Sequence, residues 1–158
     1  MPTSATWPFS PEERKRRPLL VEQPIRVRSY DIDSANHVSN IVYLRWMEDM
    51  RWLLCETHFP LQPLIDQGVT PIITSTHIEY KRPVRLFDQP QATMHIDEVS
   101  AATMKFRGEV YVNGQLATRA VHVGVFIDMA SMKPVKLPKE IKDRFESERI
   151  RLGLIEAG

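Results

Sequence analysis

The segment between residues 40 and 56 has the apolar spacing of an α-helix. Neither Pro nor Gly interrupts it, and its apolar side chains recur every three or four residues: Tyr43, Met47, Met50 and Leu54. Ser39 and Asn40 at its start are both good N-cap residues. Its polar residues occupy one narrow face, so we expect a long helix that protein surrounds on most sides.

Alternation of polar and apolar residues predicts strands on both sides of this helix. Residues 24–30 alternate before it, which suits a half-buried strand. After it, four further strands are predicted over residues 72–81, 91–99, 104–112 and 115–128. Alternation in the first of these four places five side chains on one face: Ile72, Thr74, Thr76, Ile78 and Tyr80.

Turn and helix-end residues complete the picture of the fold. Asn113-Gly114 is typical of a type I′ turn between two hairpin strands. The last strand is apolar on both faces from Ala120 onward, as in a central strand. Pro138, at a first helical position, and Gly153 bracket a final short helix. This order of elements is typical of an α+β fold, with one curved antiparallel sheet of about five strands around one long helix.

The open edges of such a sheet predict an oligomer. Strand edges that lack a partner invite pairing with another chain. The outer face of the predicted sheet also carries Ile73 and Tyr111. We therefore expect two copies to join edge to edge, with a homodimer as the smallest unit and a homotetramer as a further possibility.

The length of 158 residues suits one domain. We place it at residues 24–153, between an N-terminal tail or arm over residues 1–23 and a C-terminal tail over residues 154–158. Prolines and charged residues dominate the N-terminal segment, and apolar periodicity is absent from it. We therefore expect the first ~20 residues to be dispensable for folding.

Composition excludes several classes of protein. The formal net charge of +1 gives no sign of nucleic-acid binding. No apolar run is long enough to span a membrane, and the N-terminus lacks the apolar core of a signal peptide. We therefore expect a cytoplasmic protein that binds neither nucleic acid nor a membrane. Cys55 is the single cysteine, which rules out an internal disulfide and a cysteine-based zinc site.

The candidate chemistry gathers just before the long helix. Asp31 and Asp33 lie where the first predicted strand ends, and His37 follows the turn-forming residues 34–36. The start of a helix offers unpaired backbone N–H groups and the positive end of the helix dipole. A carboxylate and an imidazole beside such an end suit the binding of an anion or of a developing oxyanion.

This stretch resembles a known family. Asp33…His37-Val38-Ser39-Asn40…Tyr43…Glu48…Arg51 is similar to the hot-dog-fold thioesterases of the 4-hydroxybenzoyl-CoA thioesterase class, and most to their acyl-CoA and acyl-carrier-protein branch. That branch carries a His-Val-Asn-Asn-x-x-Tyr signature, in which Ser39 here replaces the first Asn. The resemblance covers residues ~24–150. It implies the hot-dog fold, hydrolysis of acyl-CoA or acyl-carrier-protein thioesters without a metal or redox cofactor, and a site completed by two subunits.

The resemblance assigns roles to individual residues. Asp33 would be the nucleophile or the general base for water, and the backbone N–H of Asn40 would polarise the thioester carbonyl. Asp33 as a turn-forming residue is the alternative. In plant acyl-carrier-protein thioesterases an Asp is followed by Asn two residues later and His four residues later. His37 keeps that spacing, but Ala35 occupies the Asn position, so His37 as a shaper of the loop stays open.

Four more residues have two interpretations each. Tyr43 and Met47 would line an acyl pocket or simply belong to the core. Glu48 would pair with Arg45 or Arg51, or act as a catalytic carboxylate on the helix. Asp31 is expected to be structural, although two close carboxylates can raise the pKa of one of them.

Two other functions remain open. The first is a hot-dog enoyl-CoA hydratase, but such enzymes carry Asp-x-Asn-Pro-x-His, and no Asn-Pro follows the aspartates here. The second is a non-catalytic acyl-CoA-binding protein that keeps the fold. A Gly-x-Ser-x-Gly motif is absent, which argues against a serine hydrolase.

Overall fold

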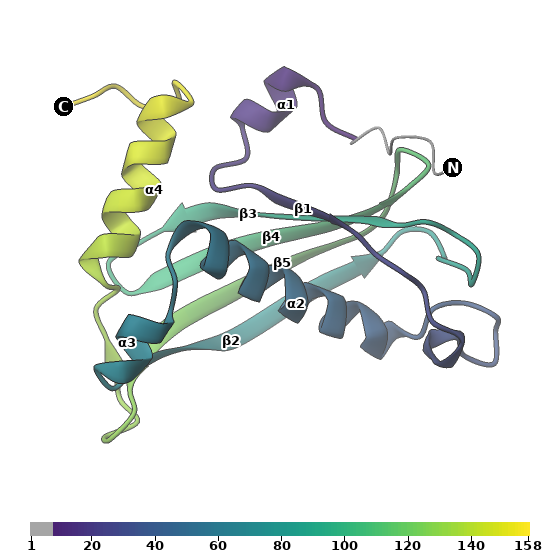
Figure 1. The fold of residues 1–158 in the computed structure, drawn as a ribbon, viewed down its shortest axis with the longest axis horizontal. Coiled ribbons are helices and arrows are strands. Elements are labelled where there is room, and N and C mark those ends of the chain that lie inside the picture. The colour runs from purple at the N-terminus through teal and green to yellow at the C-terminus, as the bar shows by residue number, and fades with distance from the viewer. Residues whose placement is uncertain (1–7) are drawn as a thin grey trace.

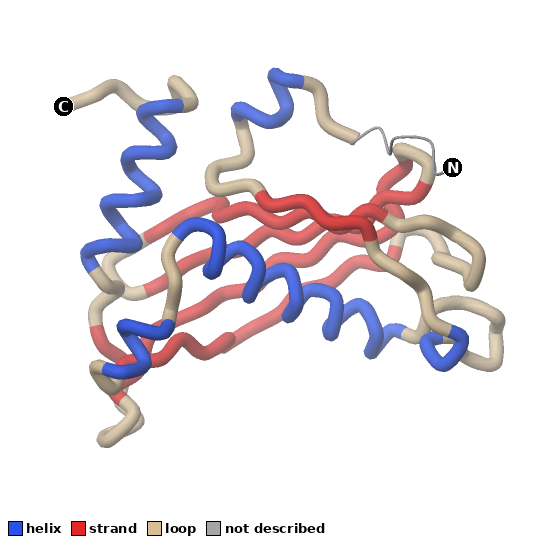
Figure 2. The backbone as a smooth tube through the Cα atoms, viewed as in Figure 1, coloured by secondary structure: helices blue, strands red, loops and turns tan. Residues whose placement is uncertain are grey.

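The computed structural model describes residues 8–158 and contains one antiparallel sheet with a long helix across one face (Figures 1 and 2). The strands are β1 (Val21–Pro24), β2 (Val69–Tyr80), β3 (Gln91–Val99), β4 (Thr103–Val112), β5 (Gln115–Asp128) and β6 (Pro134–Val135). The helices are α1 (Pro11–Lys15), the 3-10 turn η1 (Ser29–Asp31), α2 (Asn40–His58), α3 (Gln62–Asp66) and α4 (Lys139–Arg151). The strand order is β1-β3-β4-β5-β2, and β6 pairs with β5. The predicted α+β architecture is confirmed.

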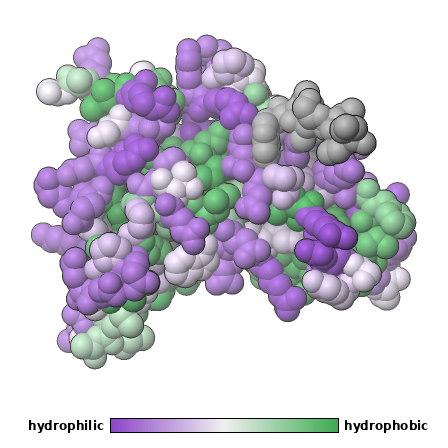
Figure 3. Space-filling model, in the orientation of Figure 1, coloured by the Kyte–Doolittle hydropathy of each residue, from purple (hydrophilic) through white to green (hydrophobic). Residues whose placement is uncertain are grey.

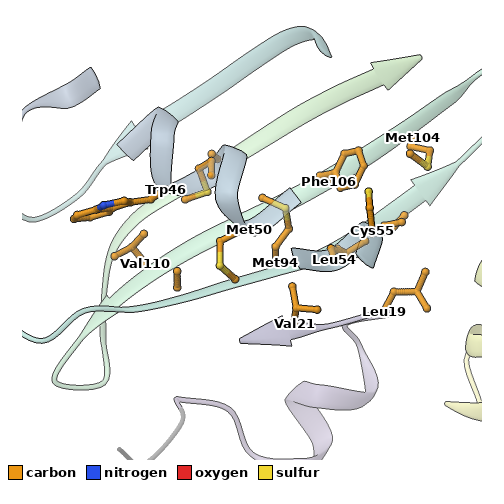
Figure 4. Packing of buried hydrophobic residues seen from close by; sticks show 14 of the residues in the cluster. Leu19, Val21, Trp46, Met50, Leu54, Cys55, Met94, Met104, Phe106 and Val110 are labelled. Atoms are coloured by element: carbon orange, nitrogen blue, oxygen red, sulfur yellow. The ribbon is translucent and has the colours of Figure 1, made fainter. Parts of the chain in front are cut away.

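The core lies between α2 and the sheet. Side chains of α2, such as Met50 and Leu54, lie among side chains of β3 and β4, such as Met94 and Phe106 (Figure 4). All four are buried, with Met50, Leu54 and Met94 fully so. Burying a side chain of this size contributes about 1.5–3 kcal/mol to folding. The spacing of apolar residues in α2 is therefore what attaches the helix to the sheet.

The predicted type I′ turn between β4 and β5 has the expected backbone. Asn113 has φ 50° and Gly114 has φ 74°, and a type I′ turn requires positive φ at both central residues. Gly153 after α4 also has positive φ, as the predicted helix end requires. Pro138 is the N-cap residue of α4 and not its first helical residue, so that helix begins one position later than predicted.

The edge strand β2 departs from the predicted alternation. Its pairing with β5 is interrupted by a bulge between Ile73 and Ser75. An extra residue in one strand reverses which side chains face the helix beyond it. Ile73 pairs opposite Gly124 and Thr76 opposite His122, so both lie on the face toward α2. The predictions that Ile72 and Thr74 share a face with Thr76, and that Ile73 lies on the outer face, are wrong.

The first strand is displaced from its predicted position. We expected it at residues 24–30, and it lies at Val21–Pro24. β1 pairs with the start of β3, and the last bond of this pairing runs from the N–H of Ile25 to the carbonyl of Pro90 at 2.8 Å. The chain before Pro90 turns away as a loop. Residues 26–30 therefore have no neighbouring strand to pair with, although their polar and apolar side chains alternate as in a strand.

The N-terminal segment packs against the sheet from residue 9 onward. Leu19 has no exposed surface, and Phe9 stacks edge-on against Tyr111 at 5.3 Å between ring centroids. Arg17 forms an ion pair of 3.3 Å with Glu109 on β4. The boundary of the folded unit that these contacts support therefore precedes β1, whereas we predicted it at residue 24.

One flank of α2 remains uncovered, in contrast to the expectation that protein surrounds it. Ile41 is 56%, Leu44 42% and Trp52 48% exposed. Of these, Trp52 lies beside β2, where it lines a cavity together with Ile72, which is also exposed. On the face of the molecule seen in Figure 3, hydrophilic residues dominate, with apolar surface visible in the middle between α1 and α4.

Candidate active site

The loop before α2 is closed by Asp33. Its Oδ1 accepts hydrogen bonds from the backbone N–H groups of Ala35 at 2.9 Å and His37 at 3.2 Å. The N–H of Asp33 donates to the carbonyl of His37 at 2.8 Å, and Asn36 takes a left-handed φ of 62°. Asn tolerates this conformation better than most residues. The side chains of Asp33 and His37 are thereby held together at the start of α2.

Asp31 has a different environment. It is buried, and its Oδ2 accepts a hydrogen bond from the N–H of Arg28 at 2.8 Å. Its carbonyl accepts the N–H of Ser39 at 2.8 Å. Val38 in turn donates to the carbonyl of Val84 at 2.7 Å, which ties the loop to residues 81–90. Asp31 thus organises backbone and does not line either of the cavities described below.

The start of α2 is left without a side-chain cap. Ser39 is the N-cap residue, but its hydroxyl makes no capping hydrogen bond. Asn40 is the first helical residue and its side chain is exposed. The first N–H groups of an α-helix have no partner within the helix. They therefore offer donors and a positive dipole end to an oxygen atom placed beside Asn40.

A cavity of about 220 Å³, which we call the N-terminal cavity, lies at this helix end. It brings together four of the predicted site residues, with five that the sequence did not suggest. The predicted residues are Asp33, His37, Asn40 and Tyr43, and the added ones are Val38, Tyr80, Lys81, Arg82 and Pro83. The carboxylate, the imidazole and the helix end thus share one concave surface.

The far wall of the N-terminal cavity is fixed by the end of β2. The hydroxyl of Tyr80 donates to the carbonyl of Asn40 at 3.3 Å. The N–H groups of Lys81 and Arg82 both donate to the carbonyl of Ala117, at 2.8 and 3.0 Å. Alternation alone had suggested only that Tyr80 ends a strand. Its place over the helix start depends on the curvature of the sheet.

The two residues of α2 that were predicted to line a pocket lie in different environments. Tyr43 lines the N-terminal cavity, is only 2% exposed, and packs edge-on against Trp46 and Tyr80. Burial raises the pKa of the Tyr43 hydroxyl, so this group stays protonated and can donate a hydrogen bond. Met47 has no exposed surface, packs against Gly108 and is not among the residues that line either cavity, which fits the alternative that it belongs to the core.

A second cavity, which we call the inner cavity, lies between the C-terminal half of α2 and the sheet. Its volume is about 340 Å³. Its walls are mainly apolar: Trp52, Cys55, Leu61, Pro71, Ile72, Ile73, Met104, Phe106 and Gly124. Glu48 and Arg51 are its two charged residues. Burial raises the pKa of the Cys55 thiol to about 12, which keeps this group neutral.

The predicted ion pair between Glu48 and Arg45 or Arg51 is not found. It is exposed, and no residue in the described part of the chain forms an ion pair with it. Arg51 instead reaches the sheet, where its Nη1 lies 3.4 Å from Nδ1 of His122. Thr76 Oγ1 lies 2.9 Å from the same ring nitrogen. Burial, followed by the nearby Arg51 charge, lowers the pKa of His122 to about 4.

Two structural findings bear on partners. Within residues 8–158, no group of three or more His, Cys, Asp and Glu side chains is placed to hold a metal ion. No helix of this same part of the chain combines the length and the apolar character needed to cross a membrane.

A model of one protein family matches most of the chain. The family is described as the thioesterase-like superfamily, and the match covers residues 27–145. It includes the loop before α2, the whole of α2 and all the residues of both cavities.

Two curated proteins illustrate the similarity in sequence. The chain is 25% identical over 128 residues to the long-chain acyl-CoA thioesterase FadM of Escherichia coli, which covers 80% of this chain and 97% of that protein. It is 29% identical over 124 residues to the acyl-CoA thioesterase YbgC of Haemophilus influenzae, covering 77% of this chain and 91% of that protein.

Two solved structures illustrate the similarity in fold. The probable thioesterase YbaW of Escherichia coli superimposes with a TM-score of 0.73 and 25% identity, over 80% of this chain and 97% of that one. A thioesterase of Thermus thermophilus, solved with coenzyme A and Zn, gives a TM-score of 0.71 at 23% identity, over 84% of this chain and 95% of that one. The predicted hot-dog fold is confirmed.

Proposed function

The chain belongs to the thioesterase-like superfamily, and we propose that it hydrolyses acyl-CoA thioesters to a free acid and coenzyme A. The observation that carries this proposal is the N-terminal cavity, where Asp33 stands beside the uncapped start of α2. Sequence similarity to proteins named acyl-CoA thioesterases supports the choice of carrier. An acyl-carrier protein is the second candidate carrier.

The proposed reaction places the thioester carbonyl at the start of α2. The backbone N–H of Asn40 donates to the carbonyl oxygen and stabilises the negative charge that develops on it. Among the described residues, the donors to Asp33 both bind Oδ1, which leaves Oδ2 for the reaction. Oδ2 takes a proton from water, and the water oxygen attacks the carbonyl carbon. The C–S bond then breaks, and the thiolate that leaves takes up a proton.

Direct attack by Asp33 is the alternative route. An acyl-enzyme anhydride would form with release of the thiolate, and water would then hydrolyse it. His37 stands on the same cavity wall and is proposed to hold the loop and the thioester in place. Tyr43 is proposed to contact the acyl group in the N-terminal cavity, whose wall it helps to form. Asp31 and Glu48 are proposed as secondary residues, Asp31 through the backbone of the loop and Glu48 through the inner cavity.

Positive charge at the mouth of the N-terminal cavity suits the phosphates of coenzyme A. Arg82 is exposed and forms no ion pair within residues 8–158, whereas Lys81 is paired with Glu79 at 3.0 Å. An Arg guanidinium binds phosphate oxygens through two parallel hydrogen bonds. We therefore assign Arg82 the larger share of phosphate binding.

The active unit is proposed to be a homodimer. β2 is an edge strand, Trp52 of α2 lies beside it, and Ile41 and Leu44 are further exposed apolar residues of the same helix. Two-fold pairing of two β2 edges would continue the sheet and cover these residues. A homotetramer would need a further interface.

Two-fold pairing would also bring the two kinds of cavity together. Within one protomer α2 runs antiparallel to β2, because Tyr80 contacts Asn40 at one end while Ile72 and Trp52 line the inner cavity at the other. Antiparallel pairing of the two β2 strands then places the start of α2 of one protomer beside the inner cavity of its partner. The thioester would lie at Asp33, and the acyl group would extend into the partner subunit.

Release of free thiol from a panel of acyl-CoAs tests the proposal. We expect purified protein to release coenzyme A from at least one short, long or aromatic acyl-CoA. Loss of enoyl absorbance from an enoyl-CoA without thiol release would indicate the hydratase instead. Binding of acyl-CoA without either reaction would indicate the non-catalytic binding protein.

A further inference from the structure

Arg51 places a positive charge in the wall of an otherwise mainly apolar cavity. It is half-buried and lines the inner cavity with Phe106, Ile73 and Gly124. No carboxylate in the described part of the chain forms an ion pair with it. Removing a guanidinium from water is unfavourable unless an acceptor compensates for it. No Arg51 nitrogen is among the buried atoms that lack a hydrogen-bond partner, so water reaches the free donors, and an acceptor on a ligand in the cavity would replace that water.

The position of Arg51 is set from the sheet side. Its Nη1 lies 3.4 Å from Nδ1 of His122, a long contact that satisfies one of five N–H groups. A guanidinium only donates, so this contact is a hydrogen bond only in the tautomer that carries the ring proton on Nε2, an atom with no partner in the described part of the chain. Thr76 Oγ1, at 2.9 Å, holds the same ring. His122 has no exposed surface, so the contact places one end of the guanidinium against the sheet.

The other charge in the cavity wall belongs to Glu48, which precedes Arg51 by three residues on α2. Burial lowers the pKa of Arg51, and the Glu48 charge opposes this by favouring the protonated form. Glu48 is exposed while Arg51 is half-buried, and no ion pair joins the two within residues 8–158. Gly124 leaves a small space between Phe106 and Ile73, since a Cβ atom there would stand 3.4 Å from the Phe106 ring and 3.6 Å from Cδ1 of Ile73. With about 340 Å³ available, and a water's share of liquid volume at about 30 Å³, the cavity has room for roughly ten non-hydrogen atoms.

We propose that the inner cavity binds the far end of the acyl group and that Arg51 determines specificity for acyl groups that end in a carboxylate. This inference rests on the proposed thioesterase function for its link to turnover. The aliphatic part of such an acyl group would lie against Phe106 and Ile73. Its terminal carboxylate would accept two N–H groups of Arg51, the pairing for which guanidinium geometry is best suited. The preferred substrates are thus short dicarboxylic acyl-CoAs.

Turnover of two acyl-CoAs of equal length tests this specificity. Adipoyl-CoA ends in a carboxylate, and hexanoyl-CoA ends in a methyl group. We expect kcat/KM of the wild type to favour adipoyl-CoA by about tenfold or more, which corresponds to ~1.4 kcal/mol. In Arg51→Met the ratio should fall to about one or below, and Arg51→Lys should retain part of the preference. A wild-type ratio near one, or a ratio unchanged in Arg51→Met, overturns the proposal.

Binding of a free acid and its amide gives a readout that does not depend on hydrolysis. Calorimetry should show hexanoate, whose carboxylate is free to pair with Arg51, binding to the wild type at least about tenfold more tightly than the neutral hexanamide, and Arg51→Met should lose this difference. Arg51-dependent hexanoate binding without any thiol release would support the cavity assignment and overturn the proposed function. Thiol release without a preference for the carboxylate would support the proposed function and overturn the role assigned to Arg51. If Arg51→Met does not fold, the wild-type ratio and Arg51→Lys decide alone.

Discussion

The sulfur of Met47 occupies the space that a side chain at Gly108 would need. A Cβ atom built on Gly108 would overlap the Met47 sulfur and stand 3.1 Å from Cε of Met94. Gly108 has an ordinary φ, so its backbone does not require glycine. The need comes from the close approach of α2 to β4, and this contact lies at the centre of the core.

Gly108→Ala should therefore destabilise the protein by overpacking. Added methyl groups in a well-packed core cost about 1–3 kcal/mol, because neighbouring side chains leave their preferred rotamers. Urea unfolding measures the loss. Gly124→Ala is the matched control, since its Cβ atom would come no closer than 3.4 Å to any neighbour, the nearest being the Phe106 ring, and Gly124 lines the inner cavity. Equal stability of the two variants would contradict the packing described for Met47.

Asp33→Asn should reduce turnover by ~10²–10⁴-fold, the scale of a lost acid–base group. Asn retains an Oδ1 that can accept the N–H groups of Ala35 and His37, so the melting temperature should change little. Thiol release at saturating acyl-CoA is the measurement. Asp31→Asn is the control and should affect turnover less, because Asp31 is buried in backbone hydrogen bonds. Near-normal turnover in folded Asp33→Asn would exclude Asp33 and direct attention to His37 or Glu48.

The structure changes our expectation for the N-terminal segment. A chain that starts at Glu22 would lose Leu19, which is fully buried, and Val21, the first residue of β1. We now expect this truncation to destabilise the protein strongly, although the sequence predicted no effect. Leu19→Ala tests the central contact alone and should cost about 2–5 kcal/mol in urea unfolding. A truncated protein as stable as the full chain would restore the original expectation.

Trp52→Glu should dissociate the proposed dimer. The substitution places a charge on the exposed flank of α2 beside the free edge of β2, where desolvation of a carboxylate opposes association. Sedimentation should show a monomer, and thiol release should be lost with it. Leu154→Glu serves as the control, because Leu154 is also exposed and follows α4, whose C-terminal end lies away from β2 (Figure 1). An active monomer would refute a site completed by two subunits.

His122 should make stability depend on pH. Its pKa in the folded protein is about 4, below the ordinary value of 6.5, because burial disfavours the charged ring. As pH falls from about 6.5 to 4, the unfolded chain binds a proton at His122 while the folded protein does not, so the free energy of unfolding decreases. In His122→Gln the slope of stability over this range should be shallower. His77→Gln, at an exposed site, should leave the slope unchanged.

The local geometry of the candidate site could be predicted from the sequence because it depends on neighbours along the chain. Asp33 and His37 are four residues apart, and their loop is closed by hydrogen bonds within that span. The start of α2 at Asn40 follows from helical periodicity and the residues before it. The turn at Asn113-Gly114 follows from the ability of Asn and Gly to adopt positive φ.

The tertiary structure alone decided what depends on distant partners. The position of β1 follows from where β3 begins, so alternation within residues 24–30 had no strand to meet. The bulge between Ile73 and Ser75 reverses which side chains of β2 face α2, and the alternation of polar and apolar residues does not reveal an extra residue. Arg51 and His122 are 71 residues apart. Their contact, and the cavity beside it, exist only because the sheet curves around α2, and periodicity within a single segment holds no information about that curvature.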